Sequence, residues 1–133
     1  MANYEAYGET FDDTFSFLEK VIYKSDLELF KSTVETLEDI NIQNNYGWSL
    51  LHMTIRRDER DMVKYLLEKG ADINIIDGVG WTPLMESIMD DMPELCKLLL
   101  ESGADKTIAN ARGATAPMLA QKFGRESMYE YLA

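Results

Sequence analysis

The chain has 133 residues, 46% of them hydrophobic and 28% charged, which is the composition of one ordinary globular domain. Its formal net charge of −11 argues against nucleic-acid binding, which depends on Lys and Arg, and against binding to anionic membrane surfaces. The single cysteine, Cys96, cannot form an internal disulfide, residues 1–13 lack the apolar core of a signal peptide, and no apolar run approaches the roughly 18 residues of a membrane span. We therefore expect a cytoplasmic protein.

Negative charge is concentrated near the N-terminus of the chain. Residues 1–46 carry 10 acidic and 3 basic side chains, whereas residues 113–133 carry 2 of each. Such charge is usually a solvated face that keeps a protein soluble, and it is also the charge that would attract a basic partner. We interpret residues 1–13 as an N-terminal extension that precedes a single repeat domain at residues 14–133.

Pairs of short helices are predicted along this domain. The first pair is weakly marked, because only its second helix is recognisable within residues 14–40. A later pair is marked best, since Thr82 is a favoured capping residue, Pro83 suits the first helical position and Pro93 starts the second helix. Apolar residues then recur at helical spacing and end at a glycine in two successive units: Met62, Val63, Leu66, Leu67 and Gly70, then Leu95, Cys96, Leu99, Leu100 and Gly103.

The pattern repeats with a period of 33 residues. Gly47, Gly80 and Gly113 are spaced by this step, and so are Trp48 and Trp81. We expect four units, and we expect the outer two to diverge because their outer faces meet water. One helix pair cannot bury its apolar side alone, whereas stacked pairs share a continuous core. The expected units cover residues 14–46, 47–79, 80–112 and 113–133.

Two motifs within the repeat are typical of a known family. The segments TPLM at 82–85 and SLLH at 49–52 are similar to the Thr-Pro-Leu-His tetrapeptide that opens an ankyrin repeat, and residues 70–74 match its Gly-Ala-Asp-x-Asn motif. The sequence therefore resembles the ankyrin repeat family, most strongly over residues 41–113. This resemblance implies an all-α solenoid of about four helix-turn-helix units, joined by short β-turn or hairpin fingers.

Ser49 and the only histidine, His52, raise the question of a nucleophile and its base. The equivalent positions in the next unit are Thr82 and Met85, so the histidine is replaced, and no motif supplies an oxyanion site. The resemblance implies instead that these two residues bond to backbone between neighbouring units. The residues that we assign to the repeat framework are Gly47, Ser49, His52, Gly70, Gly80, Thr82, Pro83, Gly103 and Gly113.

No other motif indicates catalysis or a cofactor. Cys96 occupies the second-helix position of Val63 in the unit before, which predicts a core residue rather than a reactive thiol. One histidine and one cysteine do not make a zinc site, and the DGVG segment at 77–80 lacks the lysine of a phosphate loop. We expect a protein that is not an enzyme and has no cofactor or metal.

Residues that the repeat does not require are candidates for binding a partner. The position after each turn glycine, traced back into the first unit, is occupied by Phe15, Trp48, Trp81 and Ala114, which predicts an aromatic column just before the helices. Interfaces favour aromatic, Met and Arg side chains, and the resemblance implies binding through a concave face. The alternative is that the rings only pack against adjacent turns. The predicted partner-binding residues are Tyr46, Trp48, Arg56, Arg57, Val79, Trp81, Met89 and Asp90.

These observations predict a non-catalytic protein–protein interaction module that is a monomer apart from its partner complex. The charge of −11 suggests a more specific hypothesis, a small acidic inhibitor or antitoxin-like immunity protein that neutralises a basic toxin or nuclease. The alternatives are a scaffold or regulatory adaptor that holds a signalling or chaperone partner, and a purely structural or designed repeat protein. The units differ at many framework positions, which argues against a consensus design.

Overall fold

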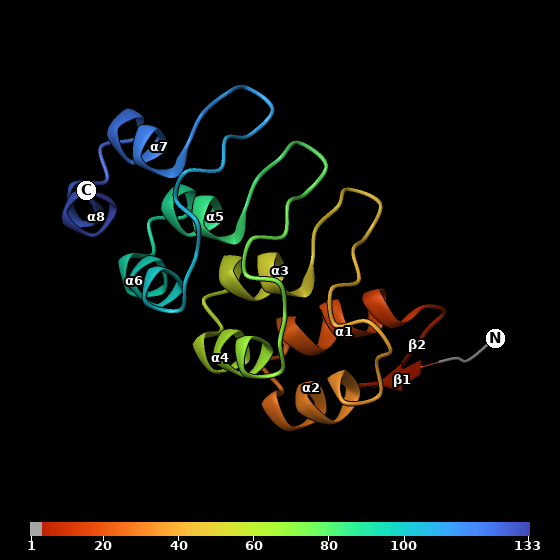
Figure 1. Ribbon diagram of the computed structural model, residues 1–133. Coiled ribbons are helices and arrows are strands. Elements are labelled where there is room, and N and C mark those ends of the chain that lie inside the picture. Colours follow the sequence, from red (N-terminus) through yellow and green to blue (C-terminus); the bar gives the residue numbers. More distant parts are fainter. Residues whose placement is uncertain (1–3) are drawn as a thin grey trace.

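Eight short helices in four pairs make up about half of residues 4–133, the part of the chain that this computed structural model describes (Figure 1). The pairs stack side by side, so the predicted helical repeat solenoid is confirmed. Among the described residues, no helix combines the length and the apolar character needed to cross a membrane. The inner helices are α1 (Thr14–Tyr23), α3 (Leu50–Arg56), α5 (Pro83–Met89) and α7 (Ala116–Lys122), and the outer helices are α2 (Leu27–Val34), α4 (Arg60–Glu68), α6 (Pro93–Glu101) and α8 (Glu126–Leu132).

Two of the inner helices, α3 and α5, begin after a capping residue at the same position of the repeat. Ser49 and Thr82 lie before α3 and α5, and each side-chain oxygen accepts a hydrogen bond from the backbone N–H three residues later. Such a bond satisfies one of the free donors at a helix start. The turn between the two helices of each unit also repeats every 33 residues, with a left-handed backbone at Ser25, Asp58, Asp91 and Gly124.

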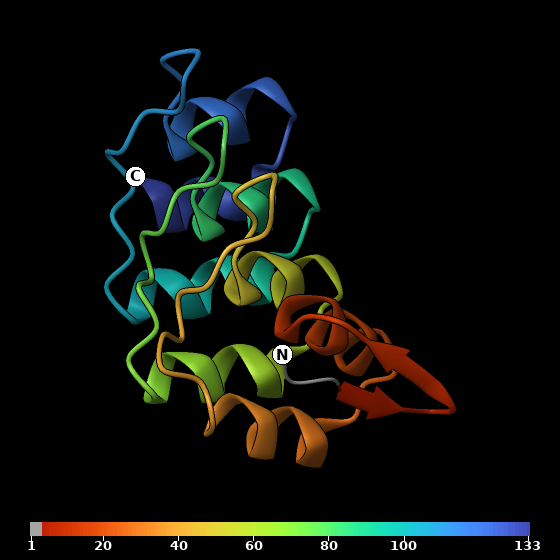
Figure 2. The ribbon, with the colours of Figure 1, turned by 90° about the vertical axis from the view of Figure 1, so that its right-hand side faces the viewer.

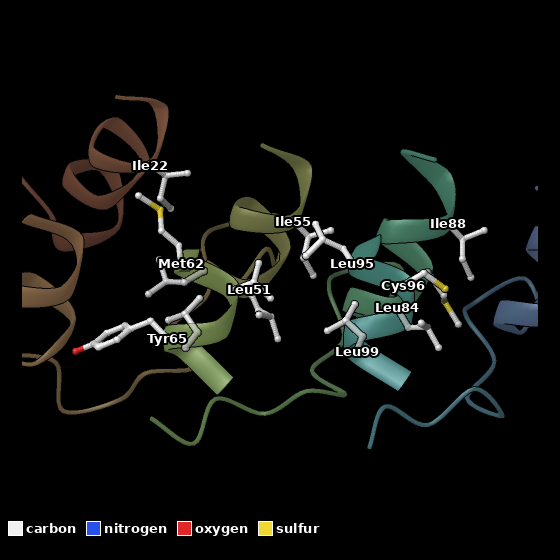
Figure 3. Close-up of a cluster of buried hydrophobic side chains, with 14 of the residues drawn as sticks. Ile22, Leu51, Ile55, Met62, Tyr65, Leu84, Ile88, Leu95, Cys96 and Leu99 are labelled. Atoms are coloured by element: carbon white, nitrogen blue, oxygen red, sulfur yellow. The ribbon is translucent and has the colours of Figure 1, made fainter. Parts of the chain in front are cut away.

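The core lies between successive helix pairs (Figure 3). Leu66 and Leu99, one period apart, are both completely buried, and each buried aliphatic side chain of this size contributes roughly 1.5–3 kcal/mol. Cys96 is also completely buried, as its position in the repeat predicts. Tyr65 of α4 packs edge-on against Phe30 of α2, so that the two outer helices share the core.

The N-terminal segment forms a hairpin that sequence reasoning missed. Strands β1 (Tyr4–Ala6) and β2 (Glu9–Phe11) pair in antiparallel register around a turn with positive φ at Tyr7 and Gly8. The hairpin lies beside α1 at one end of the molecule (Figure 2). The rings of Tyr4 and Phe11 both pack on Phe17 of α1, with centroids 5.2 and 5.8 Å away. The hairpin therefore covers an apolar side chain at the open end of the solenoid. The signal in the sequence was the Tyr-Gly turn between short alternating stretches.

The first unit departs from the repeat at its start. The step of 33 residues from Ser49 leads back to Ser16, but α1 is capped by Asp13 and begins one turn earlier. Phe15 therefore lies in the first turn of α1 with an exposed fraction of only 9%. Its predicted place in an aromatic column ahead of the helices is wrong, and both helices of this unit are present although only the second was recognisable.

Extended fingers connect the helix pairs, and each fingertip has the same hydrogen bonds. The side chains of Asn44, Asp77 and Asn110, one period apart, each accept from two backbone N–H groups of their own fingertip. Adjacent fingers are also bonded, since the Gly78 N–H donates to the Tyr46 carbonyl at 2.9 Å. Such side-chain bonds are typical of Asn and Asp in turns, and they hold the backbone in one conformation.

Gly47 and Gly113 provide a test of this close approach. Both have a left-handed backbone, with φ of 82° and 79°, but a Cβ at position 47 would collide with the backbone of Asp77 and Gly78, whereas at position 113 it would meet nothing within 4 Å. We expect Gly113→Ala to lower the free energy of unfolding by about 1 kcal/mol, from backbone strain alone. Gly47→Ala should lower it by about 3 kcal/mol or more, since the collision adds to the strain. Urea unfolding measures both, and equal losses would contradict the role of the finger contact.

Candidate protein-binding surface

The inner surface of the solenoid consists of the fingertips and the exposed sides of the four inner helices (Figures 1 and 2). Trp48 and Trp81 each precede the capping residue of an inner helix, as the repeat predicts. The inner helices end at Tyr23, Arg56, Met89 and Lys122, which places the last turn of each on the same side. The predicted binding residues are thus distributed over the fingertips and the ends of α3 and α5.

Three of the predicted residues form one cluster. The rings of Tyr46 and Trp48 lie with their centroids 5.3 Å apart, and the Arg56 guanidinium carbon lies 4.7 Å from the centroid of Trp48. Arg56 also forms an ion pair with Glu86 of α5, with Nε 3.3 Å from Oε1. Tyr46 has an exposed fraction of 70%, the largest among the exposed large hydrophobic side chains of the described residues. Sequence reasoning missed Glu86, which joins this cluster to the next unit.

Glu86 has an altered acidity because it is largely buried. Burial above all, and then the nearby Asp90 carboxylate, raise its pKa from an ordinary value of 4.5 to about 7, because together they outweigh the lowering by Arg56. Burial also raises the pKa of Asp90, while Arg56 and Arg125 oppose that shift. The charge of this part of the inner surface therefore changes near pH 7.

The remaining predicted residues lie apart from the cluster. Arg57 stacks on Tyr23 of α1, with its guanidinium carbon 4.8 Å from the ring centroid. Val79 is 57% exposed at its fingertip and Met89 is 41% exposed at the end of α5. Trp81 is half-buried and packs on the core, so its environment differs from that of Trp48. The structure brings Tyr46, Trp48 and Arg56 together. Val79 and Trp81 lie together elsewhere, where they line one groove. Asp90 lies near enough to Arg56 for their charges to interact.

Ser49 and His52 form a hydrogen-bonded link between two units. The His52 ring accepts a hydrogen bond at Nδ1 from the Ser49 backbone N–H, at 3.1 Å, so its proton is on Nε2. That Nε2–H donates to the carbonyl oxygen of Trp81 in the next unit, at 2.9 Å. Both ring nitrogens are therefore engaged, one of them with a backbone carbonyl rather than with an orienting acid. His52 is 1% exposed, and burial lowers its pKa below the ordinary value of 6.5.

Cys96 and the acidic side chains were the other groups to consider for reactivity or metal binding. Burial raises the pKa of the Cys96 thiol to about 11, which disfavours the reactive thiolate at neutral pH. Between residues 4 and 133, no group of three or more His, Cys, Asp or Glu side chains is placed to hold a metal ion.

The buried histidine makes stability depend on pH. Because the pKa of His52 is lower in the folded chain, the unfolded chain takes up the proton first as the pH falls below about 6.5, and stability is lost. We expect the wild type to lose stability relative to His52→Gln between pH 7.5 and pH 5, measured by urea unfolding at both values.

Glu86 acts in the opposite direction over the same range. Its raised pKa means that the folded chain holds the proton between pH 4.5 and about 7, which favours folding as the pH falls. This contribution is common to the wild type and to His52→Gln, so it cancels in the comparison. A difference in stability that stays constant with pH would contradict the role of His52.

The sequence matches a family model described as ankyrin repeats in three copies, over residues 18–110, which is more than half of the chain. A search of curated proteins finds no match. Members of the matched family are generally protein–protein interaction modules and typically non-catalytic. With the stacked helix pairs, the fingers and the linked Ser49 and His52, the chain belongs to the ankyrin repeat family.

Proposed function

We propose that this protein binds a partner protein, without catalysis, through its inner surface. The observation that carries the proposal is the exposure of large apolar side chains there, above all Tyr46 and Val79, which the core does not use. Aromatic, Met and Arg side chains favour the centres of interfaces. The residues proposed to contact the partner are Tyr46, Trp48, Arg56, Arg57, Val79, Trp81, Met89 and Asp90.

The cluster around Trp48 supports the proposal because it is held in place before binding. Tyr46 and Arg56 both contact the Trp48 ring, and the ion pair to Glu86 restrains the arginine further. Side chains that are already ordered lose less entropy when a partner binds, so more of the contact energy contributes to affinity. The same contacts also fit the alternative that Trp48 only stiffens its fingertip.

Substitution of the tryptophans separates these alternatives. We expect Trp48→Ala and Trp81→Ala each to weaken partner binding by about 2 kcal/mol, or roughly thirtyfold in Kd, since truncated interface anchors cost this much. The partner is identified by affinity capture from the source cell and mass spectrometry, and Kd is then measured by calorimetry. Tyr131→Ala is the control, because Tyr131 is an exposed aromatic on the outer helix α8.

Unchanged affinity in both tryptophan variants, with intact folding by circular dichroism, would refute a binding role for the two rings. Trp81→Ala needs this folding control most, because its ring packs on the core.

The net charge of −11 supports a more specific proposal, a cytoplasmic inhibitor that masks a basic toxin or nuclease. The net negative charge is concentrated in residues 1–46, which carry 10 acidic and only 3 basic side chains, and its electrostatic field would attract a positively charged partner. The alternative is a scaffold or adaptor that holds a signalling or chaperone partner, for which such a field is not required.

Salt dependence distinguishes the inhibitor from the adaptor. We expect the association rate with the true partner to fall by about tenfold or more between 0.05 and 0.5 M NaCl, because salt screens the attraction of opposite charges. Stopped-flow or surface plasmon resonance measures the rate at constant temperature and pH. An association rate that is independent of salt would count against a basic partner while leaving protein binding intact.

A further inference from the structure

An apolar groove of about 480 Å³ lies at the C-terminal end of the inner surface, between two fingertips and α7. Trp81 and Phe123 line it, and both pack on the core. Val79 and Met118 also line it, each with an exposed fraction of 57%. The apolar side chains of Val79 and Met118 are therefore in contact with solvent at this groove.

The walls of this groove are held in place by hydrogen bonds. The backbone N–H of Ala111 donates to the carbonyl of Val79 at 3.1 Å, which joins the two fingertips. The side chain of Asn110 accepts from the N–H groups of Arg112 and Ala114, which holds the second fingertip in its conformation. The groove is therefore formed before any partner arrives, and binding to it does not require the fingers to become ordered.

The charge at the groove is opposite to that of the whole chain. Arg112 at the fingertip and Lys122 at the end of α7 line it, and within residues 4–133 neither has an acidic side chain at ion-pair distance. Arg56, by contrast, is paired with Glu86 elsewhere on the inner surface. A chain of net charge −11 thus places two unpaired cations beside its apolar groove.

The other large groove of the inner surface lacks this combination. It measures about 500 Å³ and lies between the N-terminal hairpin, α1 and α3. Its lysine, Lys20, is already paired with Glu9, and its arginine, Arg57, is stacked on Tyr23. Lys122 likewise lies over an aromatic ring, 5.7 Å from the centroid of Phe123, so ring contacts do not distinguish the two grooves. The difference is the ion pair, because Glu9 already neutralises Lys20, whereas neither cation of the C-terminal groove has an acidic partner within residues 4–133.

We propose that the C-terminal groove binds a segment of the partner protein in which a large apolar side chain lies next to an Asp or Glu. The apolar side chain fills the space between Trp81, Met118 and Phe123, and the carboxylate bonds to Arg112 and Lys122. Two cations on an apolar wall fit one or two carboxylates better than the run of phosphates along a nucleic acid. The inference rests on the proposed function of protein binding and specifies the chemistry that one end of the surface recognises.

A library of random twelve-residue peptides displayed on phage tests this chemistry. We expect the selected peptides to carry an aliphatic or aromatic residue within two positions of an Asp or Glu. The protein has two tryptophans, so the variant Trp48→Phe leaves Trp81 in the groove as the single fluorescent reporter. Titration of a synthetic selected peptide into this variant should change the Trp81 emission.

Charge reversal then identifies the contacts. Arg112→Glu and Lys122→Glu should each weaken the peptide about fivefold or more, because a like charge replaces an opposite one. A peptide with Lys in place of its Asp or Glu should bind these variants better than it binds the wild type. Lys97→Glu, on the outer helix α6, is the matched control and should leave the affinity unchanged.

Several results would overturn the inference. They are peptides selected without an acidic residue, no peptide selected at all, or equal binding to Arg112→Glu, Lys122→Glu and Lys97→Glu. A dimer in sedimentation that dissociates in Met118→Asp would show that a second copy of the chain occupies the groove. If the captured partner depends on Trp48 but not on Arg112 or Lys122, the groove proposal fails and the proposed function stands.

Discussion

The stacking of neighbouring helix pairs is the constraint on which this structure depends. Each pair has only two short helices and leaves an apolar side that it cannot bury alone, so side chains such as Leu66 and Leu99 are buried because pairs stack. The fingers keep the same spacing through backbone bonds, and His52 adds a link from one unit to the next. The two ends of the stack need other solutions, and at the N-terminus the hairpin packs on Phe17.

Stacking also separates the residues that stabilise the fold from those whose side chains remain free to contact a partner. The fingertips are held in one conformation by hydrogen bonds to the side chains of Asn44, Asp77 and Asn110. Their other side chains therefore face solvent in fixed positions. The two tryptophans occupy equivalent positions but have different surroundings. Trp48 is already in contact with Tyr46 and Arg56, whereas Trp81 lines an open groove. Equivalence in the repeat therefore does not make two side chains equal in their capacity to bind.

The charges on the inner surface are mixed in sign, although the chain as a whole is strongly negative. Although the net charge is −11, the exposed ends of the inner helices change sign from unit to unit, from Arg56 and Arg57 to Asp90 and then to Lys122. Long-range attraction depends on the total charge, but close contact depends on the local one. A basic partner that carries one short apolar and acidic segment satisfies both conditions.

The sequence alone determined the repeat, the helix pairs and the burial of Cys96, because the period and the capping residues are local signals that recur along the chain. It did not reveal the hairpin or the early start of α1, since terminal units are shaped by what covers them and not by the repeat. The cluster of Trp48 with Arg56 and Glu86, and the groove between Val79 and Met118, were decided by tertiary structure. Both join residues of different units, and only the spacing and rotation of stacked units bring such side chains within a few ångströms of each other.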